Sequence, residues 1–301
     1  MSGEGTVTPP VLAPVARPPV TRPPVTRFAP SPTGRLHLGH ALSAVRAHDL
    51  ARAGGGRFLL RIEDIDGTRS RPEHVDSALR DLEWLGLEWD ALSFQSQRLD
   101  LYAEAQGRLA DLLYPCFCTR AEIAASLSAP HGPVAVYPGT CRHRSATERA
   151  ARMGEPHGWR IDMARAVERA GALHWQDERV GRVVADPLSH GDVILARKDA
   201  TASYHLAATV DDAAQGVTDV VRGVDLFVAT HVHRLLQALL GLPTPLYHHH
   251  PLIVGMDGQR LAKRHGAPAL AAMREEGADG RALAYALRRN MLPAGFRLGE
   301  A

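Results

Sequence analysis

The sequence contains no long apolar segment and very few cysteines. No uninterrupted apolar run approaches the roughly 18 residues that a membrane-spanning helix needs, so we expect no membrane association. Residues 1–26 contain no apolar stretch of the type that directs secretion, and three cysteines cannot form a full disulfide framework. These absences predict a protein of the reducing cytoplasm.

Lysine is also scarce. Of the 35 lysines and arginines, only Lys198 and Lys263 are lysines, so a lysine within a motif is informative. A net charge of +2 is too small to indicate a nucleic-acid-binding protein by itself. With 301 residues, of which 45% are hydrophobic and 23% charged, the chain has the composition of a globular protein with one large or two ordinary domains.

The N-terminal segment is rich in proline and repeats the motif Arg-Pro-Pro-Val-Thr, first from Arg17 and again from Arg22. Such a segment buries little apolar surface, so we predict that residues 1–26 form a disordered arm outside the fold. A ligand for an SH3-type domain is the alternative interpretation.

From residue 27 the chain alternates between short apolar runs and amphipathic segments. One helix is predicted from Ser70, the N-cap of a capping box closed by Glu73, through Pro72 in the first turn to Gly86. This alternation predicts an α/β fold with a mostly parallel sheet. Strands are predicted at 58–62, 193–195, 203–210 and 217–221, and a second helix at 232–239.

The strongest local motif lies at 27–40, where a predicted strand leads through a Pro/Gly loop into a helix. His37 and His40 are three residues apart and therefore share one face of the first helical turn. The free N–H groups and positive dipole end of that turn favour an anion such as a triphosphate, to which two imidazoles can donate hydrogen bonds. Gly39 between them would let a flat ring approach the backbone. Two exposed histidines without a function are the alternative.

Residues 27–40 resemble the signature of class I glutamyl-tRNA synthetases, with His37 to His40 in the place of their HIGH motif. The resemblance implies a Rossmann-type class I aminoacyl-tRNA synthetase core that binds ATP, with Mg²⁺ carried on the nucleotide. In the family the two histidines are catalytic, and Gly39 adjoins the ATP.

Residues 259–266 resemble the second class I signature, the lysine-bearing loop of KMSKS type. The resemblance implies that Lys263 is catalytic and binds ATP, because its ammonium would neutralise the departing pyrophosphate. Arg260 and Ala262 stand where lysine and serine are usual, which bears on loop closure or rate. An exposed basic loop is the alternative interpretation.

The resemblance also implies the amino acid. Two positive groups in one pocket favour a second carboxylate over an amide, and the family places Arg27 and Arg222 there, together with Tyr204. Glu63 would face the substrate ammonium. A core aromatic and a strand-end carboxylate paired with an arginine are the alternatives for Tyr204 and Glu63. The implied glutamate-binding set is completed by Phe28, Ala29, Pro30 and Ser31.

The resemblance covers residues 27 to about 266 and leaves no residues for an anticodon-binding domain. It therefore points to the truncated branch of the family, the glutamyl-Q tRNA(Asp) synthetases, which attach glutamate to the queuosine base at the wobble position of tRNA(Asp). The implied partners are ATP, L-glutamate and the tRNA(Asp) anticodon stem–loop, and the implied enzyme is a monomeric, cytoplasmic ligase. A compact enzyme that charges tRNA(Glu) and a non-catalytic tRNA-binding paralogue are the alternatives.

The cysteines match the same branch. Cys116, Cys118, Tyr137 and Cys141 resemble its zinc site, in which three thiolates and one phenolate complete a tetrahedron and hold an insertion with little core of its own. His143 is a possible substitute for the tyrosine, and three free thiols are the alternative to a metal site.

The resemblance and the composition together divide the chain into the arm and four further segments. We predict that the two halves of the Rossmann domain flank the zinc-binding insertion, and that a short helical tail follows the lysine loop. The predicted ranges are 27–113 for the first half, 114–185 for the insertion, 186–260 for the second half and 261–301 for the loop and tail.

Two further groups invite a metal interpretation, which we reject. His248, His249 and His250 lie in an extended apolar stretch, where successive side chains point to opposite faces. Asp211 and Asp212 follow a predicted strand, so we predict that they are solvated turn residues.

Overall fold

The computed structural model describes residues 22–119, 122, 136–198, 200–259 and 269–300. Most of the predicted disordered arm and residues 260–266 of the lysine loop, with Arg260, Ala262 and Lys263, lie outside the described residues. The first strand begins at Val25, two residues inside the segment predicted as an arm. No helix among the described residues is long and apolar enough to cross a membrane.

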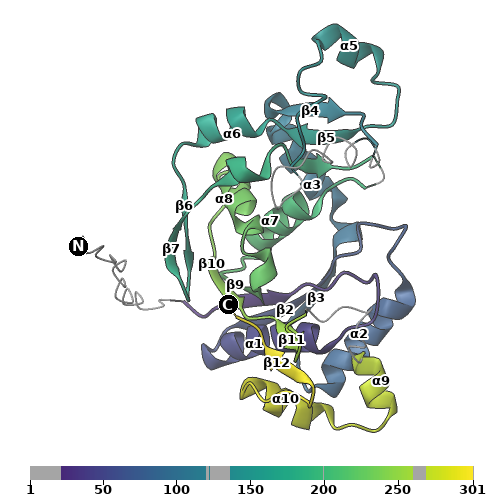
Figure 1. Ribbon diagram of the computed structural model, residues 1–301, viewed down its shortest axis with the longest axis vertical. Coiled ribbons are helices and arrows are strands. Elements are labelled where there is room, and N and C mark those ends of the chain that lie inside the picture. The colour runs from purple at the N-terminus through teal and green to yellow at the C-terminus, as the bar shows by residue number, and fades with distance from the viewer. Residues whose placement is uncertain (1–21, 120–121, 123–135, 199, 260–268, 301) are drawn as a thin grey trace, which may run out of the picture.

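Two mostly parallel sheets form the centre of the molecule (Figure 1). They meet at one edge strand of each sheet, β1 (Val25–Phe28) and β9 (Asp219–Gly223), where the N–H of Thr218 donates to the carbonyl of Val25 over 2.9 Å. The predicted mostly parallel α/β architecture is therefore confirmed. One sheet has the order β1 (Val25–Phe28), β2 (Arg57–Ile62), β3 (Ala91–Phe94), and the other β7 (Gly181–Val184), β6 (His174–Asp177), β10 (Leu246–His250), β9 (Asp219–Gly223).

Helices cross between the parallel strands. The first helix, α1, packs its alanine- and leucine-rich face on β1 and β2, and Leu42 and Val45 are completely buried there. The N-cap of the next helix is Arg71 and not Ser70, whose N–H donates to Asp66 within the preceding turn, so the predicted capping box is wrong. The crossing helices are α1 (Leu38–Ala53), α2 (Pro72–Trp84) and α8 (Ala229–Leu239).

A second helical layer packs against α8. The segment predicted as a strand at 203–210 is a helix that begins at Tyr204, with the Ser203 hydroxyl accepting a hydrogen bond from the N–H of Leu206. Because this helix is buried between α3 and α8, apolar residues occur on most of its faces and hide the helical period. The layer comprises α3 (Leu99–Arg108), α6 (Met163–Ala170) and α7 (Tyr204–Ala214). Short 3₁₀ turns elsewhere in the chain are η1 (Gln95–Gln97), η2 (Ala110–Leu112), η3 (Pro187–His190) and η4 (Val224–Leu226).

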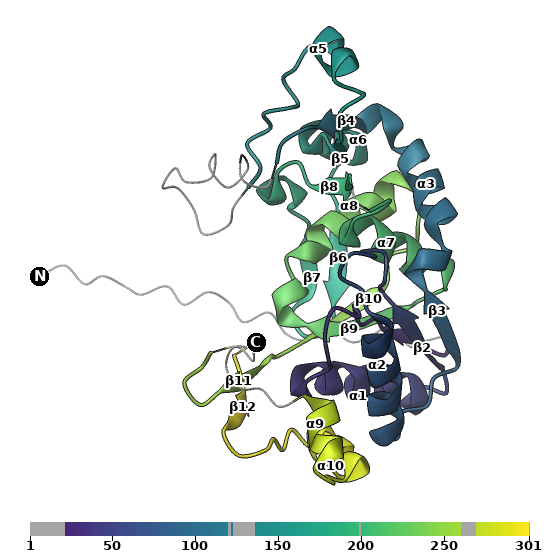
Figure 2. The same ribbon diagram turned by 90° about the vertical axis from the view of Figure 1, so that its right-hand side faces the viewer.

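A small antiparallel sheet carries the cysteine-containing segment at one end of the molecule (Figure 2). Strand pairing crosses the predicted domain boundaries, because β6 and β7 join the sheet of β9 and β10, whereas β8 pairs with β5. The small sheet comprises β4 (Leu113–Cys116), β5 (Gly158–Ile161) and β8 (Ile194–Ala196), beside α5 (Ala146–Ala151).

The C-terminal elements pack at the opposite end, beneath α1 and α2 (Figures 1 and 2). The predicted tail helix is confirmed as α10, in which Leu283, Ala284 and Leu287 join the core of α1. These elements are α9 (Leu270–Glu275), α10 (Gly280–Arg288) and the two-stranded antiparallel sheet of β11 (Ile253–Gly255) and β12 (Phe296–Leu298).

Candidate active site

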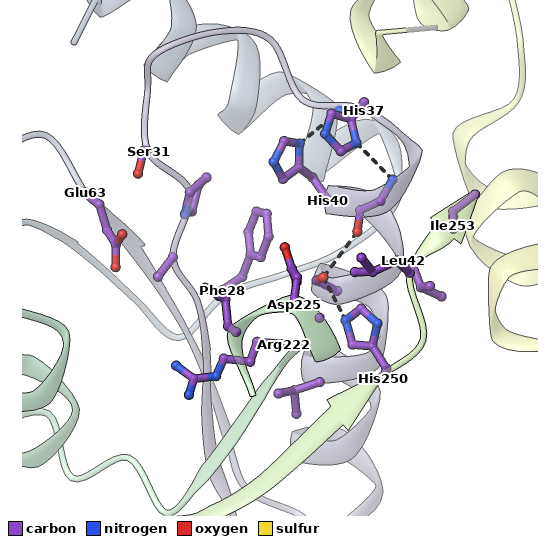
Figure 3. A pocket seen from close by; sticks show the side chains of 18 of the residues that line it. Phe28, Ser31, His37, His40, Leu42, Glu63, Arg222, Asp225, His250 and Ile253 are labelled. Atoms are coloured by element: carbon purple, nitrogen blue, oxygen red, sulfur yellow. Dashed lines mark hydrogen bonds between the residues drawn. The ribbon is translucent and has the colours of Figure 1, made fainter. Parts of the chain in front are cut away.

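A cavity of about 660 Å³ opens at the carboxyl ends of β1, β2, β9 and β10 (Figure 3). In open α/β sheets, ligands bind at this edge. The cavity brings together the sequence-predicted glutamate and ATP residues that the structure describes, and Lys263 lies outside the described residues. The predicted residues in its wall are Arg27, Phe28, Ala29, Pro30, Ser31, His37, Gly39, His40, Glu63, Tyr204 and Arg222.

The two motif histidines form the start of α1. His37 is the N-cap, and its Nδ1 accepts the N–H of Gly39 over 3.1 Å, while Nδ1 of His40 accepts the N–H of His37 over 3.2 Å. The ring centroids are 3.8 Å apart. Because each Nδ1 is an acceptor, each neutral ring carries its proton on Nε2 and can donate a hydrogen bond to a ligand oxygen.

The sequence predicts that Gly39 lets a ligand ring approach the backbone. The structure shows a second reason for glycine at this position, which is a contact within the protein. A Cβ at this position would lie 3.0 Å from Cε1 of His37. Glycine therefore leaves room for the capping imidazole.

Arg27 reaches the cavity from β1 and is held by a carboxylate. Its Nε donates to Oδ1 of Asp212 over 2.9 Å, and the same oxygen accepts from Nη2 of Arg61 over 2.6 Å. Burial opposes the charge on Asp212, but the ion pairs with both arginines outweigh it and lower the pKa of this carboxyl. Asp211 accepts from Nε of Arg98, the N-cap of α3. Both aspartates are buried, so the predicted solvated turn is wrong.

Arg222 reaches the cavity from β9 and is held by uncharged groups. Its Nε donates to Nε2 of His249 over 3.1 Å, and its Nη2 donates to Oγ1 of Thr230 over 2.5 Å. Its Nη1 lies 3.2 Å from the hydroxyl of Tyr204 and 3.3 Å from Nδ1 of His233. Burial lowers the pKa of both imidazoles, so neither adds a charge here near neutral pH.

Glu63 follows β2 and faces the cavity across from the histidines (Figure 3). Its N–H donates to the carbonyl of Pro30 over 3.0 Å, which ties the loop after β1 to the end of β2. Burial raises the pKa of Glu63 to about 7, although the positive charges of Arg61 and Arg27 oppose this shift. A bound cation beside Glu63 would restore its ionised form.

His250 and Asp225 also line the cavity, and the sequence reasoning did not select them. Nδ1 of His250 lies 2.9 Å from the carbonyl of Pro251 and therefore donates to it, so Nε2 accepts from the hydroxyl of Ser43 over 2.8 Å (Figure 3). The extended conformation predicted for these histidines is confirmed as β10. In the sequence, only the alternation of side chains between the two faces of a strand indicated that neighbouring histidines have different environments.

The three cysteines gather at the end of β4. Their sulfurs lie within 4.8 Å of one another, and the Tyr137 hydroxyl is 3.5 Å from the sulfurs of both Cys116 and Cys118. Zinc–sulfur bonds of about 2.3 Å at tetrahedral angles separate two sulfurs by about 3.8 Å, so the spacing fits a tetrahedral ion. His143 is outside this group, and Arg142 Nη2 lies 3.5 Å from its Nε2.

Comparison with known proteins agrees with this geometry. The family described as tRNA synthetases class I (E and Q), catalytic domain, matches residues 24–296. A glutamyl-Q tRNA(Asp) synthetase of Rhodobacter capsulatus is 49% identical over 268 residues, which cover 84% of this chain and 95% of that protein. One of Deinococcus radiodurans is 47% identical over 86% of each chain. The chain belongs to the glutamyl-Q tRNA(Asp) synthetase family.

Solved structures of the wider family have the same fold. A glutamate tRNA ligase from Elizabethkingia meningosepticum, in complex with its amino acid, superimposes with a TM-score of 0.76 at 27% identity. A glutamate-tRNA synthetase from Elizabethkingia anophelis gives 0.77, also at 27% identity. Both matches cover 89% of this chain and about three fifths of the other. The predicted class I catalytic core is thus confirmed.

Proposed function

We propose that the protein activates L-glutamate with ATP and transfers it to the queuosine base of tRNA(Asp). One observation carries this proposal: a single cavity places Arg27, Arg222 and Glu63 beside a helix start that carries two imidazole donors. The cations suit the carboxylates of glutamate, Glu63 suits its ammonium, and the helix start suits a phosphate. The names of the relatives support the same substrates.

In the first step, an oxygen of the glutamate α-carboxylate attacks the α-phosphorus of ATP. A new oxygen–phosphorus bond forms, the bond to the β,γ-phosphates breaks, and the products are glutamyl-adenylate and pyrophosphate. His37 and His40 would donate hydrogen bonds to the phosphoryl oxygens as charge builds there. Lys263 would neutralise the departing pyrophosphate. Mg²⁺ would arrive with ATP and reduce its charge.

In the second step, a hydroxyl of the cyclopentene ring of queuosine attacks the carbonyl carbon of the adenylate. The ester forms, the hydroxyl proton passes to solvent, the bond from the carbonyl carbon to the phosphate oxygen breaks, and AMP leaves. We propose that the anticodon stem–loop brings this hydroxyl to the mouth of the cavity, and that the protein acts as a monomer in the cytoplasm. The protein's part in this step is positioning.

We also propose a structural zinc ion on Cys116, Cys118, Tyr137 and Cys141. Nε of Arg160 lies 3.3 Å from the Cys116 sulfur and its guanidinium stacks on the Tyr137 ring, so a cation already balances negative ligands. A bound zinc would cross-link the end of β4 to the segment before α5.

The metal proposal is tested on purified protein. Metal analysis should give about one zinc per chain, and the melting temperature should fall on chelation. The Cys141→Ser variant should contain less zinc than the wild type. If the thiols are free, the zinc content of the two proteins should be the same. Protein without zinc, whose melting is unchanged by a chelator, would contradict the proposal.

The function is tested by transfer of radiolabelled glutamate to matched RNAs. We expect label on tRNA(Asp) that contains queuosine and none on queuosine-free tRNA(Asp) or on tRNA(Glu). Label on tRNA(Glu) would instead show a compact charging enzyme. Absence of label on all three, together with RNA binding, would show a non-catalytic tRNA-binding protein.

A further inference from the structure

We propose that His249 and Asp177 are positioning residues that aim the Arg222 guanidinium into the amino-acid pocket through an imidazole of fixed tautomer. The assignment rests on the proposed function, because it takes Arg222 to bind a carboxylate of glutamate. Neither residue lines the cavity. They act on the substrate only through the arginine.

The hydrogen bonds fix the proton of His249. An arginine Nε always carries hydrogen, so the 3.1 Å contact from Arg222 makes Nε2 of His249 an acceptor. The proton of the neutral ring then lies on Nδ1 and donates to Oδ2 of Asp177 over 2.7 Å. Both side chains are 0% exposed, so water cannot supply an alternative partner.

Asp177 is itself held in one orientation. Its Oδ1 accepts the N–H groups of Arg179 and Val180 over 3.0 and 3.1 Å, in the turn between β6 and β7. Its Oδ2 also accepts the N–H of His249 over 3.3 Å. The carboxylate is thus saturated by the β6–β7 hairpin and by β10, which leaves one geometry for the imidazole.

Aromatic rings close the remaining sides of the imidazole. Tyr247 is parallel to His249, with an interplanar angle of 5°, and the centroid of Phe227 lies 5.0 Å away. Trp175 meets the same ring edge-on. These rings restrict rotation of the imidazole and so help to set the direction of Nε2, while the hydrogen bonds to Arg222 and Asp177 set the tautomer.

The arrangement orients Arg222 without neutralising it. A guanidinium has five N–H groups, and the four contacts to His249, Thr230, Tyr204 and His233 use four of them. One N–H on Nη2 is left for a ligand. The carboxylate of Asp177 is separated from the guanidinium by a whole imidazole, so it fixes the direction of Arg222 but does not compete directly with a substrate carboxylate.

Three variants test this assignment by glutamate-dependent pyrophosphate exchange, with KM measured for glutamate and for ATP. We expect His249→Leu to raise the KM for glutamate about 10- to 100-fold, the effect of losing a hydrogen bond to a charged group, with less than about threefold change for ATP. His249→Gln offers an amide oxygen near the position of Nε2 and should recover most of the loss. The amide of Asp177→Asn can donate to Nδ1 and reverse the tautomer, so this variant should resemble His249→Leu.

His248→Gln is the matched control. Nε2 of His248 contacts Oδ1 of Asp219 over 2.8 Å, so the neighbouring residue of the same strand has the same type of pair without a contact to Arg222. We expect the KM for glutamate to be unchanged in this variant. Melting curves show which variants fold.

Nitrogen-15 NMR of wild-type protein reads the tautomer independently of activity and of variant folding. We expect the His249 proton on Nδ1, and a proton on Nε2 would overturn the assignment. An active wild type whose His249→Leu variant keeps its glutamate KM, or raises both KM values equally, would overturn it too. A wild type without glutamate-dependent exchange would overturn the proposed function and this assignment together.

Discussion

Arg27 and Arg222 lie in the same cavity but are held in opposite ways. Arg27 shares a buried carboxylate, Asp212, with Arg61, whereas the direct partners of Arg222 are a hydroxyl, a phenol and two imidazoles. The first arrangement connects β1 and β2 to α7 and partly neutralises the charge. The second arrangement leaves the positive charge of Arg222 available to a ligand. Two residues of one type in one pocket can thus serve architecture and recognition to different degrees.

The largest expected effect comes from breaking the ion pairs that hold Arg27. In Asp212→Asn, two buried guanidinium groups lose their shared carboxylate, and we expect the free energy of unfolding to fall by about 3–5 kcal/mol. Urea denaturation measures this loss. Asp81→Asn is the control, since Oδ1 of Asp81 pairs with the partly exposed Arg274 away from the cavity. An equal loss of unfolding free energy in both variants would show that Asp212 stabilises the fold no more than Asp81 does.

The charge of Glu63 is influenced by Arg27 and Arg61 and can be tested through the binding of glutamate. Burial raises the pKa of this carboxyl to about 7, against the opposing charges of Arg61 and Arg27. Below that pH the free enzyme holds a proton that must leave before Glu63 can face an ammonium. The KM for glutamate should therefore rise as pH falls from 8 to 5.5, approaching about tenfold per pH unit at the low end.

The Glu63→Gln variant should have a high and pH-independent KM for glutamate over that range. The KM for ATP serves as the control, because Glu63 lies on the opposite wall of the cavity from the helix start that we assign to the phosphates (Figure 3). A wild-type glutamate KM that stays constant between pH 5.5 and 8 would refute the role of this carboxylate.

The smallest expected effect comes from removing one of the uncharged partners of Arg222. Thr230→Val removes one of the four hydrogen-bond acceptors around Arg222 and leaves the other three. We expect the free energy of unfolding to fall by about 1 kcal/mol, well below the loss in Asp212→Asn. A loss of the same size as in Asp212→Asn would show that the two arginines are held with equal strength, and the comparison would fail.

Local sequence signals predicted the start of α1 and the strand ends around the cavity. The His37 motif, the run at 58–62 and the run at 217–221 each carry short-range information, because a strand that ends in polar residues places them at the sheet edge. The residues in the cavity wall follow from these edges. The resemblance to a known family added the identity of the amino acid.

The supports behind the pocket could not be predicted in this way. Asp212 lies 185 positions from Arg27 along the chain, and Asp177 lies 72 positions from His249. Such pairs depend on how elements pack, and α7 was itself misassigned because burial on most faces removed its helical period. With α7 predicted as a strand, Asp211 and Asp212 were wrongly placed in a solvated turn.

The central claim is that glutamate and ATP meet in the cavity between Arg27, Arg222 and the start of α1. A crystal structure with a non-hydrolysable analogue of glutamyl-adenylate tests it most directly. We expect the glutamyl group between the two arginines with its ammonium at Glu63, and the phosphate position beside His37 and His40. An analogue bound elsewhere, or bound with its glutamyl group pointing away from both arginines, would contradict the account.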